Sequence, residues 1–118
     1  MFKRIVFRHM DHSDVIEDHA NQHLAKIEHF LEESEHDPVY IDLIFEPSKV
    51  HAHHKIELRV KSPNYDLIEI YEHEGIPFYD ALDIVINKMY QQLHERKRLI
   101  KKDEKKMVGR HDEFKKQR

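Results

Sequence analysis

Apolar and polar residues alternate in four short stretches of the chain, residues 2–10, 39–46, 53–61 and 66–72. Alternation with a period of two is the pattern of a β-strand that buries one of its faces. The second stretch shows it most clearly, because one of its faces carries only the apolar residues Val39, Ile41, Leu43 and Phe45. The pattern therefore predicts four strands.

Two other stretches, residues 14–32 and 75–102, carry apolar residues at helical spacing. The first has Ser13 or Asp11 as its expected N-cap. In the second, Pro77 suits the first turn. Asp80 and Asp83 suit the positive end of the second helix dipole. The apolar stripe of the first helix is Ile16, Ala20, Leu24, Ile27 and Leu31. That of the second is Ala81, Leu82, Val85, Ile86, Met89, Leu93 and Ile100.

The order of these elements is β-α-β-β-β-α, which predicts an α+β fold, a two-layer sandwich. In it, a four-stranded sheet carries both helices on one face, and its other face is polar and meets water. The short links between the last three strands predict an antiparallel meander. We expect residues 1–102 to form one α/β domain. Residues 103–118 lose the apolar periodicity and are expected to form a charged, disordered tail.

Composition excludes several classes of protein. A chain of 118 residues suits one domain, and the lack of cysteine excludes disulfides and thiolate chemistry. With two glycines there is no Gly-rich phosphate loop. No apolar run is long enough to span a bilayer, and the N-terminus lacks a signal-peptide pattern. We therefore expect a cytoplasmic protein that does not act at a membrane.

The net charge of −3 hides an uneven distribution along the chain. Residues 1–78 hold 8 Lys and Arg against 16 Asp and Glu, a net charge of −8. Residues 79–118 hold 12 against 7, a net charge of +5. Such a chain can offer a polyanion one face only. The 12 histidines can add positive charge below about pH 6.5.

Two groups of histidines are candidate metal ligands. His51, His53 and His54 cluster at the start of a strand, but only His51 and His53 share a face and the neighbouring residues supply no third ligand. His19 and His23 have the i, i+4 spacing of a metal-binding pair without an HExxH motif. We expect no metal and no other cofactor.

Catalysis has no support in the sequence either. The chain has four serines, none of them in a nucleophile elbow, and no set of nucleophile, base and oxyanion hole stands out. We expect a protein that is not an enzyme and has no small-molecule substrate.

The basic C-terminal half of the second helix is the main candidate for binding. Its cations can reach the phosphates of duplex or structured RNA, while Tyr90, Gln91 and Gln92 can meet sugars or base edges. Two other interpretations stay open. The cations can be an ordinary solvated helix C-terminus, or they can meet a partner protein with an acidic groove.

Several segments match one protein family in order along the chain. They are residues 19–28, 62–65, 73–74, 79–82 and 86–93. On these segments the chain resembles the ribosome hibernation factors, the family of ribosome-associated inhibitor A (protein Y) and the short hibernation-promoting factor. The resemblance covers residues 3–100. It implies a fold similar to a double-stranded-RNA-binding domain, in agreement with the pattern above.

The resemblance implies a partner and a function. Members of the family bind the small ribosomal subunit in the channel that holds mRNA and tRNAs, and block translation initiation under stress or in stationary phase. It implies contact with ribosomal RNA and not with DNA. Whether idle single ribosomes or ribosome pairs are favoured stays open, because the tail is basic where protein Y has an acidic one. The alternative is a module that modulates a transcription (sigma) factor or a translation factor.

The resemblance and the charge pattern together predict a set of RNA-binding residues on the two helices. Lys26, Lys88 and Gln92 match family positions, whereas Gln91 and Glu95 stand where a basic residue is expected. The predicted set is His19, His23, Lys26, His29, Lys88, Gln91, Gln92, Arg96, Lys97, Arg98, Lys101 and Lys102.

Overall fold

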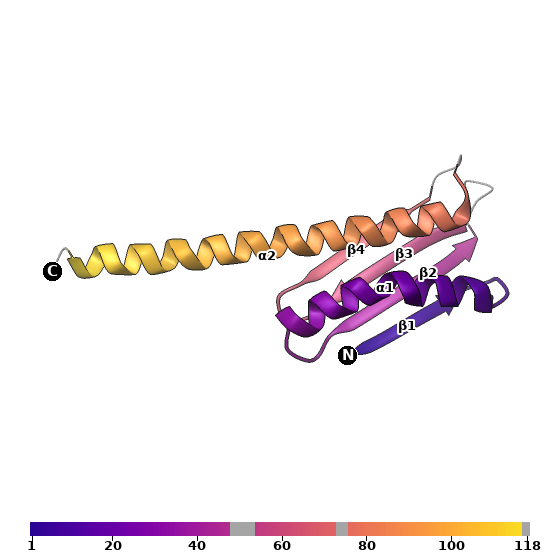
Figure 1. Ribbon diagram of the computed structural model, residues 1–118, viewed down its shortest axis with the longest axis horizontal. Coiled ribbons are helices and arrows are strands. Elements are labelled where there is room, and N and C mark those ends of the chain that lie inside the picture. Colours follow the sequence, from indigo (N-terminus) through magenta and orange to yellow (C-terminus); the bar gives the residue numbers. More distant parts are fainter. Residues whose placement is uncertain (48–53, 73–75, 117–118) are drawn as a thin grey trace.

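A computed structural model describes residues 1–47, 54–72 and 76–116, with side chains described up to Lys102 except that of His54. Figure 1 shows four strands and two helices in the predicted order β-α-β-β-β-α. The elements are β1 (Phe2–Phe7), α1 (Asp14–Ser34), β2 (Tyr40–Pro47), β3 (His54–Lys61), β4 (Asp66–Tyr71) and α2 (Phe78–Lys116).

The four strands form one mixed sheet in the order β1-β2-β3-β4. β1 pairs with β2 in parallel, because the helix α1 between them carries the chain back to the same end of the sheet. β2, β3 and β4 pair antiparallel, which confirms the predicted meander. In the centre of the sheet, Leu43 lies between Ile5 on β1 and Leu58 on β3.

Both helices cover the same face of the sheet (Figure 1), as the α+β sandwich predicts. The core lies between the layers and includes the predicted strand face of Val39, Ile41, Leu43 and Phe45. The predicted helix stripes are buried apart from Ile16 and Ile100, which are half-buried. The core also contains Phe30, which the stripe of α1 did not include.

The other face of the sheet is less polar than predicted. Ile68 and Ile70 on β4 are 43% and 48% exposed, and Phe2 on β1 stacks on exposed Tyr40 with ring centroids 5.2 Å apart. These side chains occupy strand positions, which favour β-branched and aromatic residues even where one face is open. The outer face of the sheet is therefore open to water as predicted, but it carries apolar side chains beside the polar ones.

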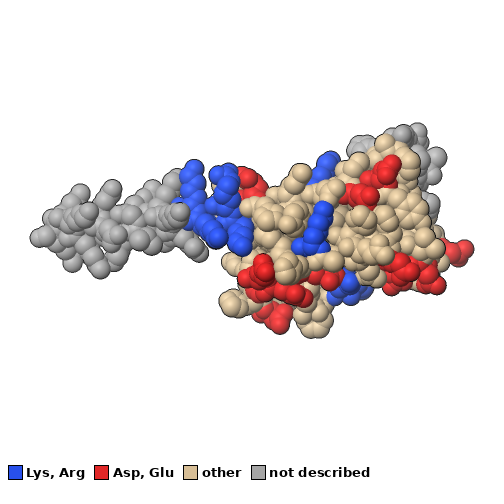
Figure 2. Space-filling model, viewed as in Figure 1, with Lys and Arg blue, Asp and Glu red and all other residues tan. Residues whose placement is uncertain are grey.

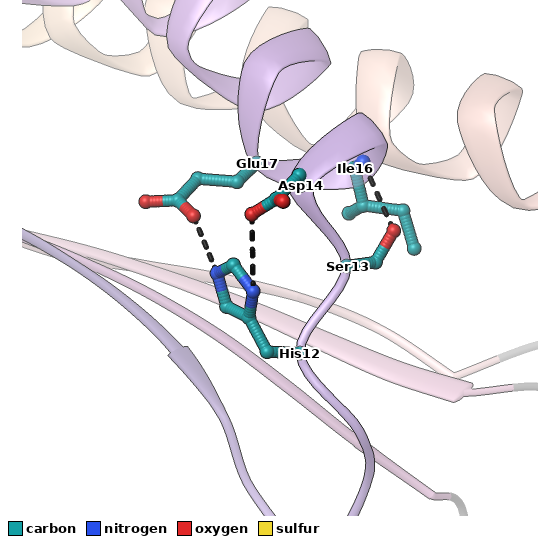
Figure 3. A network of polar contacts seen from close by, with 5 residues as sticks. All are labelled: His12, Ser13, Asp14, Ile16 and Glu17. Atoms are coloured by element: carbon teal, nitrogen blue, oxygen red, sulfur yellow. Dashed lines mark hydrogen bonds and ion pairs between the residues drawn. The ribbon is translucent and has the colours of Figure 1, made fainter.

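The N-terminus of α1 is capped by Ser13, one of the two residues proposed from the sequence. Its Oγ accepts a hydrogen bond from the Ile16 N–H at 3.3 Å. Beside it, the His12 ring lies between two carboxylates, with Nδ1 3.3 Å from Asp14 and Nε2 against Glu17 (Figure 3). The acidic residues of this first turn suit the positive end of the helix dipole.

The helix α2 is longer than predicted and starts later. Its first turn has the Ala81 N–H donating to the Pro77 carbonyl at 3.0 Å, and Gly75, where the sequence placed the start, lies outside the described residues. The helix continues to Lys116 and extends past the end of the sheet (Figure 1). The disordered tail expected after Lys102 is helical backbone here, because its Lys, Glu and Met residues extend an already nucleated helix.

The division of the chain at residue 102 stays a prediction. Neither of the helices in the described part of the chain is apolar enough over a sufficient length to cross a bilayer.

Candidate nucleic-acid interface

The helices α1 and α2 lie side by side and run in the same direction. Residues near the start of α1 therefore contact residues near the start of α2, and later residues of α1 contact later residues of α2. His19 contacts Asp83, Lys26 contacts Asn87 and Phe30 contacts His94. We call this line of contacts the seam. It divides into two ends with different chemistry.

The first end of the seam, the histidine end, consists of His19 and His23 on α1 and Asp83 on α2. The Oδ1 of Asp83 lies 2.9 Å from His19 Nε2 and 3.6 Å from His23 Nε2. The two imidazole rings lie 4.3 Å apart, and Tyr79 packs edge-on against His19 at 4.9 Å. Asp83 was expected to serve the helix dipole, and its contact with the histidines gives it a second role.

The middle of the seam holds part of the predicted basic surface in place. The Nζ of Lys26 donates to the Asn87 side chain and lies 5.1 Å from the centre of the Tyr90 ring. Gln92 donates to the Glu69 carboxylate on β4 and so faces the sheet. Lys88 and Gln91 are exposed. Of the four predicted residues in this part of the seam, Lys88 and Gln91 are therefore free to meet a large ligand.

An aromatic cluster supports the far part of the seam. Phe30 lies 4.7 Å from the His94 ring and 6.3 Å from the rings of Tyr65 and Tyr90. The Nζ of Lys97 lies over Phe30, 5.2 Å from the ring centre. A cation over an aromatic face is attracted by the ring quadrupole. The cluster therefore fixes the position of one cation on the molecular surface.

The second end of the seam, the cationic end, is the predicted basic group of α2. It consists of Arg96, Lys97, Arg98, Lys101 and Lys102. Figure 2 shows Lys and Arg side chains gathered on α2 where it extends past the sheet, while acidic side chains are prominent over the rest of that face. Among residues whose side chains are described, the cationic end has one ion pair, between Arg98 and Glu95 at 2.6 Å. The hydrogen bond from Arg98 lowers the pKa of the Glu95 carboxyl.

A network of hydrogen bonds anchors the end of α1 to the β3–β4 turn next to these cations. The Glu35 carboxylate accepts bonds from the Ser62 hydroxyl, from the Asn64 N–H at 2.9 Å and from the Asn64 side-chain amide at 2.8 Å. Burial raises the pKa of Glu35, but these bonds and nearby His36 outweigh it and hold the pKa below its ordinary value. Burial and the Glu35 charge raise the pKa of Tyr65.

A hollow of about 320 Å³ opens between this anchor and the cationic end. Its lining residues are Glu33, Ser34, Glu35, Asn64, Tyr65, Lys97, Ile100 and Lys101. Two of these are lysines of the cationic end, and the rim therefore offers donors to an anionic group. Segment 62–65 was selected from the sequence for its family resemblance, and the structure gives it a structural part in shaping this hollow.

The structure distributes the twelve predicted residues over three environments. His19 and His23 face Asp83, and His29 lies 3.2 Å from Glu33 one turn along α1. Lys26, Gln92, Lys97 and Arg98 have partners within the chain, as described above. The exposed residues without an ion pair in the described part are Lys88, Gln91, Arg96, Lys101 and Lys102.

Four residues that the prediction missed organise this surface, namely Asp83, Asn87, Glu69 and Glu35. None of these polar residues has a local sequence signature, and each finds its partner through tertiary packing. The histidines at 51 and 53, which were considered as metal ligands, lie outside the described residues.

The fold of this chain is shared with known proteins, and this likeness defines its structural class. Solved structures with this fold include the N-terminal domain of Protein Y from Thermus thermophilus and a ribosomal subunit interface protein from Coxiella burnetii. The former has a TM-score of 0.59 and 16% identity, covering 78% of this chain and 94% of that one. The latter has a TM-score of 0.61 and 18% identity, covering 82% and 98%. At these identities the likeness establishes the fold, an α+β domain of the Protein Y type.

The sequence then identifies the family. Residues 4–101 match the family described as Sigma 54 modulation protein / S30EA ribosomal protein, and the chain belongs to this family. The match confirms the resemblance to the ribosome hibernation factors found in the sequence. Among curated proteins, none matches the chain significantly.

Proposed function

We propose that this protein is a ribosome-associated hibernation factor. It binds ribosomal RNA of the small subunit in the mRNA–tRNA channel and blocks translation initiation under stress or in stationary phase. Binding is its whole task, and no reaction is catalysed. The observation that carries the proposal is the cationic end of the seam. There, Arg96, Lys101 and Lys102 are exposed and have no ion pairs among the described side chains, although the first 78 residues of the chain carry a net negative charge.

Phosphate binding is the role that this arrangement fits best. Lysine and arginine neutralise phosphates and release the counterions that these hold, and this release supplies much of the affinity for nucleic acid. The cations lie close together along one helix, so their spacing can match a fixed arrangement of phosphates. Family membership supports a ribosome as the source of these phosphates, since the family description names a ribosomal protein.

The remaining predicted contacts rank behind the cationic end. Lys88 and Gln91 lie on the same exposed surface of α2 and extend the interface toward the middle of the seam. Lys26 reaches RNA only if it leaves Asn87, and Gln92 only if it leaves Glu69. His19, His23 and His29 rank last as RNA ligands, because a carboxylate lies next to each of them.

Co-sedimentation with purified small subunits tests the proposal. The variant Arg96→Gln/Lys101→Gln removes two exposed cations, and we expect it to leave the subunit fraction at salt concentrations where the wild type remains bound. The control is Arg59→Gln/Lys61→Gln, which removes two exposed cations from the opposite face of the sheet. Equal loss in both variants, or no loss in either, contradicts a specific interface at the cationic end.

The family description also contains the alternative, a modulator of sigma 54. The same cations can bind an acidic groove on a protein. Purification of the tag-free chain with its partners from stationary-phase cells separates the two functions. Small-subunit RNA in the complex supports the proposal, and a transcription factor without ribosomal RNA supports the alternative.

A further inference from the structure

We propose that the histidine end of the seam is a zinc-binding site, with His19, His23 and Asp83 as its ligands. The proposal concerns the end of the seam opposite the cations and is independent of ribosome binding. In the sequence, the two histidines lacked a third ligand. The structure supplies it from another helix, 60 residues further along the chain from His23.

The donor set has the chemistry of a zinc site. Imidazole nitrogen and carboxylate oxygen are both ordinary zinc ligands, and two histidines with one carboxylate form a set used in proteins that keep a fourth position open. The spacing of His19 and His23 by one helical turn places both rings on one face of α1, as in other helical zinc sites. Asp83 on α2 supplies the third ligand.

The geometry already approaches that of a coordinated ion. The three donor atoms all lie within 4.8 Å of one another. Tetrahedral zinc with bonds of about 2.0 Å holds its ligand atoms about 3.3 Å apart. The Asp83 Oδ1 lies 2.9 Å from one imidazole nitrogen and 3.6 Å from the other, on either side of that value. Both separations are therefore within about 0.4 Å of the value for coordinated zinc.

The surroundings fix the ligands and leave room for a fourth. Tyr79 packs against the His19 ring at 4.9 Å and the two imidazoles contact each other, so both rings are oriented before an ion arrives. The side chains are 26%, 40% and 34% exposed, which leaves the site open to solvent. A zinc ion held by these three side chains can therefore take a water molecule from solvent as its fourth ligand.

A second group of possible ligands is a weaker candidate. Asp14 and Glu17 approach His12 from different nitrogens of one ring (Figure 3), so a single ion cannot use both contacts as they stand. That group also has one imidazole, whereas the histidine end has two. Among the described residues the histidine end is therefore the site with the better donors for zinc.

Metal binding by the full-length, tag-free chain tests the proposal. We expect one Zn²⁺ per chain by isothermal titration calorimetry, and a tetrahedral absorption spectrum when Co²⁺ replaces it. His23→Ala and Asp83→Asn should each weaken zinc binding by at least about 10-fold, the lower limit seen when even an outer-sphere partner of a metal is removed. Asp83→Asn keeps the size of the side chain and a hydrogen-bonding oxygen, so the fold should persist, which circular dichroism checks.

The chain has many other histidines that could bind zinc, so control variants are needed to locate the site. His36→Ala removes an exposed histidine far from the cluster and should leave binding unchanged. His51→Ala/His53→Ala/His54→Ala removes the other candidate cluster and should leave the one-to-one site intact. Absence of zinc binding in the wild type overturns the proposal. Binding that survives in His23→Ala and Asp83→Asn, or that disappears only in the triple variant, overturns it equally.

Discussion

The two ends of the seam between α1 and α2 differ in whether their charged groups have partners within the molecule. At the histidine end, His19 and His23 meet Asp83, so the polar groups satisfy one another within the molecule. At the cationic end, Arg96, Lys101 and Lys102 remain exposed without such partners among the described side chains. Both ends lie on the same pair of helices, and both were predicted to bind RNA.

The difference shows that a basic or histidine-rich helix face is not by itself a binding surface. Internal partners reduce the charge that a group can offer, and the structure reveals those partners. The same rule applies within the cationic end, where Arg98 is paired with Glu95 while its neighbour Arg96 is not. The centre of the proposed interface therefore lies at residues 96–102 of α2, further along the seam than the family positions Lys26 and Lys88.

The largest effect is expected from removing the aromatic support under the cationic end. Phe30 is 7% exposed and packs against His94, Tyr65 and Tyr90. Phe30→Ala should lower the free energy of unfolding by about 3–5 kcal/mol, because it leaves a cavity in the core. Urea denaturation measures this. The milder Phe30→Leu should cost less than half as much, and equal costs would contradict the packing described here.

A smaller effect is expected at the Glu35 anchor, and it depends on pH. The pKa of Glu35 is lowered in the folded protein, so its ionised form stabilises the fold above the ordinary pKa of a glutamate. This contribution is lost as the pH falls through the folded pKa. Glu35→Gln should therefore cost about 1 kcal/mol at pH 7. The difference from the wild type should disappear in strong acid.

Denaturation of both proteins at a series of pH values measures this difference. The matched control is Glu32→Gln, which replaces an exposed glutamate on the same helix and should leave stability unchanged across the pH range. A constant difference between wild type and Glu35→Gln down to the most acidic pH would mean that the ionised carboxylate is not the anchor.

The smallest effect on stability is expected from Glu95→Gln. This variant tests the difference between cations with an ion-pair partner and cations without one. The pair with Arg98 is exposed to solvent, so stability should hardly change. The released guanidinium, however, can bind a phosphate. Binding to small subunits should become tighter, and its salt dependence steeper by about 0.7–0.9, the value for one added contact. Weaker binding would place Glu95 itself in the interface.

Much of the fold could be predicted from the sequence because it depends on local periodicity. The alternation in residues 39–46 and the helical stripe from Ala81 to Leu93 identify elements that each bury one face. The end of α2 could not be predicted in the same way, because residues 103–116 lack an apolar stripe and continue the helix by propensity alone. The exposed Ile68 and Ile70 likewise have nothing in the sequence that marks them as outward-facing.

The candidate site was harder to predict than the fold. The basic cluster at residues 96–102 is visible as a charge pattern, and the structure leaves most of it exposed. The pairing of His19 and His23 with Asp83 depends on two helices lying side by side in the same direction. No sequence pattern indicates the contact of 2.9 Å between His19 Nε2 and Asp83 Oδ1, or the hydrogen bonds that Glu35 accepts. Contacts between distant segments require the packed structure.

The salt dependence of small-subunit binding, measured at pH 7.5 without added zinc, tests the central claim most directly. The claim is that phosphates are bound by the cationic end and not by the histidine end. Arg96→Gln/Lys101→Gln should reduce the slope of log affinity against log salt by about 1.4–1.8, which corresponds to two phosphate contacts. His19→Gln/His23→Gln should leave the slope as in the wild type. An unchanged slope in the first variant, with a reduced slope in the second, would contradict the account.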